Sequence, residues 1–494
     1  MRLSWWPASV RSHAVLPVDR PLLRPHNKLS LMNCFRCPPL RRLALFLAVV
    51  AAASDVTTRA DDKPLNVLFI AVDDLRPELG CYGNPHIHTP NIDRLAAGGT
   101  VFRRAYCQVA VCGASRASLL TGLRPTPRRF LNYLTWAEKD APSARTLPEE
   151  FRRHGYQCLS NGKVFHHRDD TADRSWSERP WKPDISGTVT RNPESKALRG
   201  GRKNRGPVFE AADVADNAYP DGQTADRTIA DLRRLQQQDH RFFLACGFLK
   251  PHLPLYAPQK YWDLYAADKI ELADNRFPPQ HAPGALKGSG EIHSYHNRDI
   301  PFNSEQWHRS CRHGYYACVS YIDAQIGRIL QTLDELKLRD HTIVCLWGDH
   351  GWHLGEHNFW GKHNVMHLST NAPLIVSAPG FSRGQTCDRL VEFVDIYPTL
   401  CELAGITTDN SQLAGTSFRP LLTDARKPWK SAVYSKFGPA VSVITEQYNY
   451  AEFENGERML FDLHKDAAEN VNIAAEPDRA PVVERLSRLL HEPR

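Results

Sequence analysis

The chain of 494 residues is 42% hydrophobic, 10% aromatic and 24% charged, an ordinary globular composition that excludes collagen, a coiled coil and bulk disorder. Its net charge of +7 comes from the first 53 residues, which hold eight of the 62 Lys and Arg but one of the 55 Asp and Glu. The rest of the chain carries 54 charges of each sign, so its composition predicts no nucleic-acid partner.

The N-terminal segment has the layout of a secretory leader. From Met32, a basic stretch is followed by the apolar run 43–53, with cleavage expected after Ala53. We therefore expect residues 1–53 to be a signal peptide, with Met32 as an alternative start, and the protein to be exported to the periplasm or the extracellular space. Eleven apolar residues are too few for a bilayer span of about 20, so no stable membrane insertion is expected. A buried or amphipathic helix is the alternative reading.

The next part of the chain, 64–428, alternates strand and helix patterns. Nearly continuous apolar runs predict buried strands at 66–72, 156–159, 242–248, 342–347 and 373–378. Helical patterns lie between them at 91–97, 224–238, 316–336 and 396–404. This alternation predicts an α/β fold with a large mixed, mostly parallel sheet flanked by helices. The polar segment 168–222 reads as an insertion over one edge of that sheet and not as core.

The pattern changes after residue 428. Short strand patterns follow one another at 432–437, 441–445, 448–453 and 459–463. A helical pattern covers 481–491, near the end of the chain. We expect 429–494 to form a small antiparallel sheet with a terminal helix packed on it.

Polar residues that could carry chemistry stand directly after four of the predicted strands. In α/β sheets, ligands bind beyond the carboxyl ends of the strands. We therefore expect one edge of the sheet to hold Asp73, Asp74, Lys163, His166, His252, Asp349 and His350.

The adjacent Asp73 and Asp74 are costly at the end of a buried strand, because like charges at close range resist joint ionisation. A divalent cation relieves this repulsion, and with Asp349 the set offers the hard oxygen ligands that Ca²⁺ or Mg²⁺ prefers. An equally weighted alternative makes the pair a helix cap or a turn. Cys112 precedes a helix that we expect Ser115 to cap, which would acidify its thiol, although most single cysteines are packing residues.

The segment 112–122, CGASRASLLTG, resembles the signature of type I sulfatases, Cys-x-Pro-Ser-Arg followed by Leu or Thr and Gly. The resemblance covers roughly residues 64–475, through ordered motifs at 66–75, 162–166, 250–255, 348–357 and 460–473. The spacing of GKVFH at 162–166 is similar to that of the iduronate-2-sulfatase subfamily, whereas generic arylsulfatases have Gly-Lys-x-His. This resemblance implies an alkaline-phosphatase-like fold.

The resemblance also implies a cofactor and a modification. In sulfatases the motif cysteine, here Cys112, is oxidised to formylglycine by a formylglycine-generating enzyme or an anaerobic maturase. One calcium ion is implied, with ligands at Asp73, Asp74, Cys112, Asp349 and His350. Ala114 stands where the signature usually has proline, which leaves the type of maturase open.

The remaining roles come from the same resemblance. Arg116 matches the residue that holds the hydrated aldehyde, Lys163 and Lys362 match those that bind sulfate oxygens, His252 matches the acid for the leaving alcohol, and His166 matches the base that assists sulfate release. Taken alone, each lysine would more often be a surface charge, and each histidine would as often be structural.

The leading hypothesis is an exported, calcium-dependent sulfatase that acts on a sulfated carbohydrate, with uronate 2-O-sulfate as the first substrate to test. Two alternatives stay open. One is a phosphonate or phosphate monoester hydrolase of the same superfold, and the other is a non-catalytic glycan-binding relative.

Overall fold

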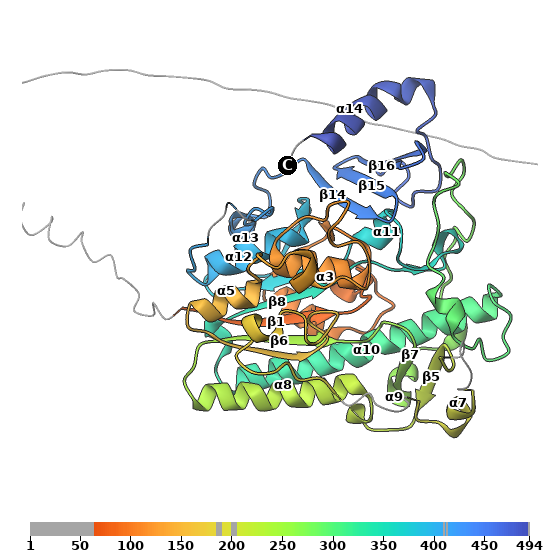
Figure 1. The fold of residues 1–494 in the computed structure, drawn as a ribbon. Helices are drawn as coiled ribbons and strands as arrows, with labels where there is room; N and C mark the ends of the chain where they lie inside the picture. The colour runs from red at the N-terminus through yellow and green to blue at the C-terminus, as the bar shows by residue number, and fades with distance from the viewer. Residues whose placement is uncertain (1–63, 184–189, 199–204, 409–410, 412, 493–494) are drawn as a thin grey trace, which may run out of the picture. The chain divides into compact units, whose positions relative to one another are not determined.

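The computed structural model describes residues 64–183, 190–198, 205–408, 411 and 413–492, so the expected leader, residues 1–53, lies outside them. A seven-stranded sheet runs through this part of the chain (Figure 1). Its strands, from edge to edge, are β12 (Gln385–Cys387), β2 (Thr100–Phe102), β11 (Leu374–Ser377), β8 (Thr342–Gly348), β1 (Asn66–Val72), β6 (Phe242–Phe248) and β4 (Gln157–Gly162). The pairs from β8 to β4 are all parallel, whereas β11 is antiparallel to both of its neighbours.

The central strand β1 shows why the apolar runs form the middle of the sheet. Its side chains alternate between two hydrophobic clusters, so that Leu68 and Ile70 belong to one and Phe69 to the other. On the second face, the ring of Phe69 lies 5.6 Å from that of Phe243 on β6 and 5.4 Å from that of Trp347 on β8. A strand buried on both faces requires cover on both sides.

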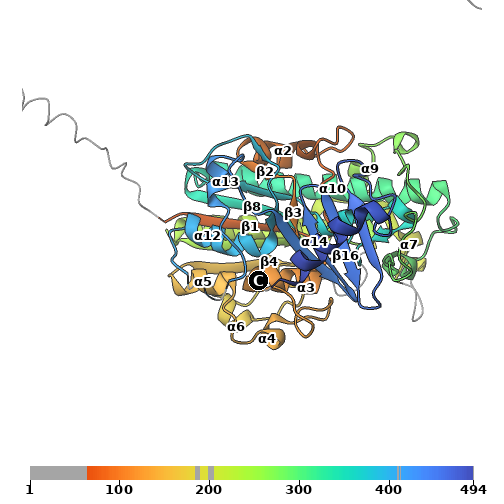
Figure 2. The ribbon, with the colours of Figure 1, turned by 90° about the horizontal axis from the view of Figure 1, so that it is seen from above.

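Helices supply this cover on each face. The helices α2 (Pro90–Ala97), α8 (Pro220–Gln237) and α10 (Glu305–Glu335) pack on the face of Leu68 (Figures 1 and 2). The helices α3 (Cys112–Thr121), α5 (Leu147–Arg153), α12 (Ile396–Leu403) and α13 (Arg419–Thr423) pack on the face of Phe69. Local signals start two of them. The Thr146 hydroxyl and the Glu149 carboxylate form a capping box at α5, and the Ser304 hydroxyl caps α10.

The C-terminal elements form the expected antiparallel sheet. Its strands, in order, are β14 (Ala432–Phe437), β15 (Ala440–Thr445), β16 (Tyr448–Phe453) and β17 (Arg458–Asp462). Helix α14 (Ala480–His491) packs Val483, Leu486 and Leu490 against Tyr450 and Leu460 of this sheet. The predicted fold class, a mixed, mostly parallel sheet flanked by helices plus a small antiparallel sheet with a terminal helix, is therefore confirmed.

The segment 168–222 differs from expectation, because parts of it are core. Trp176, Val208 and Tyr219 are buried, and β5 (Phe209–Ala212) pairs in parallel with β7 (Leu255–Pro258). Its polar composition hid these anchors. The other short elements are β3 (Ala105–Tyr106), β9 (His353–Leu354), β10 (Trp360–Gly361), β13 (Val391–Glu392), α4 (Ala137–Asp140), α6 (Ala172–Ser175), α7 (Pro193–Ala197), α9 (Gln259–Trp262) and α11 (His367–Thr370).

Two negative findings apply to the described residues alone. None of their helices combines the length and the apolar character that a membrane crossing needs. All ten of their cysteines are free thiols, so no disulfide is formed among them.

Candidate active site

The carboxyl ends of β1 and β8 bring four predicted residues together. The two strands are paired in parallel and end in register, so Asp73 and Asp74 lie beside Asp349 and His350. The backbone N–H of Asp74 donates to Oδ1 of Asp349 over 3.0 Å. All four side chains are buried, and Asp74 has a left-handed backbone with φ of 62°. The ends of the two strands thus place a cluster of ionisable side chains out of contact with water.

Helix α3 adds the thiol and the guanidinium. Cys112 is the first residue of the helix, and Arg116 lies one turn later on the same face. The buried Arg116 guanidinium donates from Nε to Asp349 Oδ2 over 2.9 Å and from Nη2 to Asp73 Oδ1 over 3.2 Å. The expectation that Ser115 caps this helix is wrong, because its hydroxyl donates to the main-chain carbonyl of Asp349. The contacts of Arg116 and Ser115 with Asp349 hold α3 against the end of β8.

The segment after β4 supplies a lysine and a histidine. The Lys163 ammonium contacts the Asp73 carboxylate, and the Lys163 carbonyl accepts a hydrogen bond from Arg116. His166 lies three residues later, and its buried Nδ1 has no hydrogen-bond partner. An unpaired buried nitrogen is costly, so a ligand that bonds to His166 Nδ1 would be stabilised there.

Lys362 and His252 complete the cluster from two further segments. Lys362 Nζ lies 2.8 Å from Asp74 Oδ1, and His252 Nε2 lies 3.9 Å from Asp74 Oδ2. The other nitrogen of His252, Nδ1, is 2.7 Å from the Leu253 carbonyl, so Nε2 is the atom that faces the site. Glu291 sits between the two, with Oε2 3.3 Å from Lys362 Nζ and Oε1 3.5 Å from His252 Nε2.

The structure therefore brings together all of the residues named from the sequence. They are Asp73, Asp74, Cys112, Arg116, Lys163, His166, His252, Asp349, His350 and Lys362. Sequence reasoning missed Glu291, which begins a short 3-10 helix (Glu291–Ser294) between α9 and α10 without any motif around it. A single carboxylate in such a segment carries no signal that separates it from a surface residue.

Comparison with known proteins decides the family. The family model for sulfatases matches residues 65–406, and the model "N-sulphoglucosamine sulphohydrolase, C-terminal" matches 355–494. This chain belongs to the type I sulfatase family. It is 34% identical to human iduronate 2-sulfatase over 413 residues, which cover 74% of this chain and 73% of the relative. It is 32% identical to a sulfatase of Formosa agariphila, with coverage of 87% and 86%.

The sulfatase also shares its fold with a related class of enzyme. The crystal structure of a phosphonate monoester hydrolase from Agrobacterium radiobacter aligns with a TM-score of 0.71 at 24% identity, over 86% of this chain and 94% of the other. The expected alkaline-phosphatase-like sulfatase fold is thereby confirmed, and the chain is an enzyme of the sulfatase type.

The electrostatic field of the sulfatase site acts strongly on the Cys112 thiol. Burial alone would raise the pKa of this thiol, but the ammonium groups of Lys163 and Lys362 outweigh burial, and its pKa lies well below the ordinary value. His166 interacts with the thiol and lowers its pKa further. An anionic group at this position is therefore stabilised, as the side chain of a reactive residue requires.

The carboxylates of the sulfatase site respond unequally to burial. Burial raises the pKa of Asp349 to about 7, although Arg116 and His350 act against it. The pKa of Asp73 lies well below its ordinary value because Lys163 and other cations outweigh burial. For His350, burial alone would lower the pKa, but the neighbouring Asp349 carboxylate outweighs burial and raises the pKa to about 9. Burial therefore disfavours the charged form of the Asp349 carboxyl, and a bound cation would restore it.

The buried carboxylates of Asp73, Asp74 and Asp349 give the sulfatase the oxygen donors that a hard divalent cation prefers. One ligand atom from each of Asp73, Cys112, Asp349 and His350 lies within 4.8 Å of the others. His350 Nε2 is buried without a hydrogen-bond partner, although Asp74 Oδ1 and Asp349 Oδ1 are 3.4 and 3.5 Å away. An orphaned nitrogen among clustered carboxylates is what a bound cation would satisfy.

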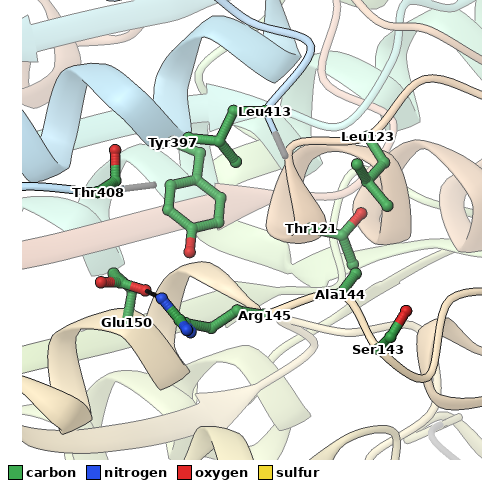
Figure 3. Close-up of a pocket in the computed structure, with 9 residues that line it drawn as sticks. All are labelled: Thr121, Leu123, Ser143, Ala144, Arg145, Glu150, Tyr397, Thr408 and Leu413. Atoms are coloured by element: carbon green, nitrogen blue, oxygen red, sulfur yellow. Dashed lines mark hydrogen bonds and ion pairs between the residues drawn. The ribbon is translucent and has the colours of Figure 1, made fainter. Parts of the chain in front are cut away.

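A separate cavity of about 310 Å³ lies at the other end of α3 (Figure 3). It is lined by Thr121, the last residue of the helix, and by Tyr397, and the ion pair of Arg145 with Glu150 at 2.8 Å closes one side. Helix α3 has ten residues, so about 14 Å separates this end from Cys112. None of the predicted catalytic residues lines this cavity.

Proposed function

We propose that this sulfatase hydrolyses sulfate esters of a sulfated carbohydrate, with uronate 2-O-sulfate as the preferred class. The main support is the cluster of Cys112, Arg116, Lys163 and Lys362 around buried carboxylates, which concentrates positive charge where a sulfate group would sit. The 34% identity to human iduronate 2-sulfatase supports the choice of sugar.

Cys112 would act as formylglycine and the site would hold Ca²⁺. The donor set fits the ion through Asp73, Asp74, Asp349, His350 and the modified Cys112 side chain. When bound, the ion supplies Lewis-acid polarisation of the sulfate ester. The oxidised Cys112 supplies a hydrated aldehyde, which offers one oxygen as nucleophile and a second hydroxyl for sulfate release.

The other side chains handle charge and protons. Lys163 and Lys362 would bind sulfate oxygens and offset the negative charge of sulfuryl transfer, and Arg116 would orient the Cys112 side chain. His252 would give the proton at Nε2 to the leaving sugar oxygen, because its Nδ1 is engaged by the Leu253 carbonyl. His166, with an unpaired Nδ1, would take a proton during sulfate release.

The proposal includes a cellular setting. Residues 1–53 would direct export to the periplasm or extracellular space, and a formylglycine-generating enzyme or an anaerobic maturase would oxidise Cys112. The chain would divide into a catalytic part, 64–428, and a smaller part, 429–494.

A direct test measures the turnover of matched esters by protein from a host that carries a maturase. We expect the sulfate monoester to be cleaved faster than the phosphate and phosphonate monoesters of the same alcohol, and Cys112→Ala to abolish sulfate release while Cys345→Ala retains it. Faster phosphonate turnover would favour the phosphonate hydrolase alternative, which the shared fold at a TM-score of 0.71 keeps in view.

The modification itself is tested by mass spectrometry of the peptide that contains Cys112. Formylglycine is expected. An unmodified cysteine in protein from a maturase-containing host, together with retained glycan affinity, would favour the non-catalytic glycan-binding alternative.

A further inference from the structure

Exposed apolar side chains gather on one short loop of the sulfatase. Six large hydrophobic side chains are exposed among the described residues, and three of them lie within 131–134. Leu131 is 39% exposed, Tyr133 is 53% exposed and Leu134 is 60% exposed. The remaining three are scattered over distant segments at Leu264, Phe277 and Phe302. Single exposed apolar residues need no explanation, but a contiguous group marks an interaction surface.

This loop lies at the catalytic residues. It follows α3 (Figure 2), and a Cβ atom on Gly113, next to Cys112, would lie 2.5 Å from the Tyr133 carbonyl oxygen. The Tyr133 ring meets the His166 ring edge-on, with 6.3 Å between the centroids. The next ring in the loop, Trp136, stacks on His167 at 4.4 Å. The exposed side chains therefore stand beside the proposed nucleophile and the proposed base.

The loop is held in shape by its own contacts. Phe130 is fully buried, and its N–H donates to the Asp140 carboxylate over 2.8 Å. The N–H of Leu134 donates to Asn132 Oδ1 over 2.8 Å. These bonds hold the backbone on both sides of Tyr133, while the side chains of Tyr133 and Leu134 are exposed. A fixed aromatic ring loses little entropy when it binds a ligand.

Positive charge lies on another side of His166. A cavity of about 240 Å³ is lined by Lys163 and His166 and by two further cations, Arg168 and Lys182. The Arg168 guanidinium donates a hydrogen bond to the Asp169 carboxylate, and Lys182 is exposed. Two cations beyond those of the sulfate site suit a substrate that carries a second negative group.

We infer that Tyr133, with Leu131 and Leu134, is a binding platform for the sugar unit next to the one that loses sulfate, and that Arg168 and Lys182 bind an acidic group of the same chain. The apolar face of a sugar ring packs on aromatic side chains, while its carboxylate or sulfate pairs with Arg and Lys. The substrate class that fits is an acidic oligosaccharide. This inference rests on the proposed sulfatase function.

The test compares a 2-O-sulfated uronate monosaccharide with a tetrasaccharide that carries the same unit at its end. The wild type is expected to have a KM about three- to tenfold lower for the tetrasaccharide, the range of one aromatic contact. Tyr133→Ala should remove this difference between the two KM values, and Tyr133→Phe should retain it. Leu264→Ala, exposed elsewhere, is the matched control.

Salt dependence tests the charged part. The tetrasaccharide KM of the wild type should rise with NaCl, and the double variant Arg168→Gln with Lys182→Gln should show a flatter response. Equal KM values for both esters in the wild type, or a preference that survives Tyr133→Ala, would overturn the platform alone. Failure of the wild type to release sulfate from either ester would overturn the proposed function, and this inference with it.

Discussion

Two clusters of buried charge in this sulfatase have similar composition and different designs. The first joins Glu392 and Asp395 to Arg124 and Lys430. Arg124 is bidentate on Glu392 at 2.5 and 2.6 Å, and Lys430 bridges both carboxylates at 2.9 and 2.7 Å. Among the described residues, no buried polar side-chain atom of this group is without a partner. The group joins the loop after α3 to β13 and β14. Its charged side chains pair with one another, so this cluster is closed.

The second cluster, at the ends of β1 and β8, is open. Asp73, Asp74 and Asp349 share one edge, a neighbouring nitrogen of His350 is orphaned, and Asp74 has a left-handed backbone. In a network whose charged groups are all paired, the ion pairs hold segments of the fold together. A network with unpaired donors and acceptors can use them to bind a ligand. Between these two clusters, the unsatisfied nitrogen of His350, and not burial or charge, marks the one that we propose to be functional.

The largest expected effect comes from the open cluster. His252→Gln should lower kcat on a sugar sulfate by about 10²- to 10⁴-fold, because the departing alkoxide loses its proton donor. On 4-nitrophenyl sulfate, whose leaving group needs no proton, the loss should be far smaller. His86→Gln, at an exposed histidine, is the control. Equal losses on both esters would remove the acid role from His252.

In the closed cluster, Arg124→Met should affect folding alone. Without Arg124, Lys430 alone faces the two buried carboxylates of Glu392 and Asp395, so one of them loses its counterion and the free energy of unfolding in urea should fall by about 3–5 kcal/mol. Activity per folded molecule should be unchanged, and the exposed Arg128→Met should be neutral in both assays. A fall in kcat without a change in stability would contradict the division between the two clusters.

Calcium should distinguish the clusters directly. At 100 times its Kd, the ion should stabilise chelator-treated wild type by about 2.7 kcal/mol, seen as a rise in Tm. Asp349→Asn should abolish the rise, whereas Asp395→Asn should preserve it even though its starting Tm is lower. Preservation of the full rise in Asp349→Asn would exclude this carboxylate as a ligand.

The two clusters should also differ in the pH dependence of stability. Arg124 and Lys430 outweigh burial and lower the pKa of Glu392 from 4.5 to about 2, so its contribution is present above pH 4.5 and is lost as pH falls toward 2. Burial raises the pKa of Asp349 from 3.8 to about 7, so the chelated protein should lose stability as pH rises from about 4 to 7. Urea unfolding at a series of pH values measures both slopes. Glu392→Gln should flatten the acid slope and Asp349→Asn the other; unchanged slopes would contradict these assignments.

Much of the fold follows from apolar runs. The strands at 66–72 and 242–248 match the prediction because they are buried on both faces and show no polar interruption. Strand direction does not follow, since an apolar run reads alike in either sense, and β11 proved antiparallel to its neighbours. Three-residue strands such as β2 and β12 are too short for any periodicity. Helix α10 begins at Glu305, eleven residues before the predicted start, because the polar first turns obscure the pattern.

Sequence reasoning could likewise place some residues of the candidate site and not others. Asp73 and Asp349 could be placed at one edge by physical reasoning, because parallel strands end together. Cys112 and Lys362 depend on contacts between segments far apart in the chain. The place of Cys112 before a helix was only a weak signal of a reactive thiol, and family resemblance was needed to assign both residues to the site. Glu291 had neither signal, because its role arises only when the chain folds back onto Lys362 and His252.

The placement of Cys112 also sets an order of events in the life of the protein. Its side chain is 3% exposed, below the first turn of α3 and against the two strand ends. If a separate enzyme oxidises this thiol, as proposed, that enzyme needs the surrounding peptide inside its own catalytic groove, which the buried position of Cys112 does not allow. The proposed oxidation would therefore precede folding, and a maturase slower than folding would leave part of the population inactive.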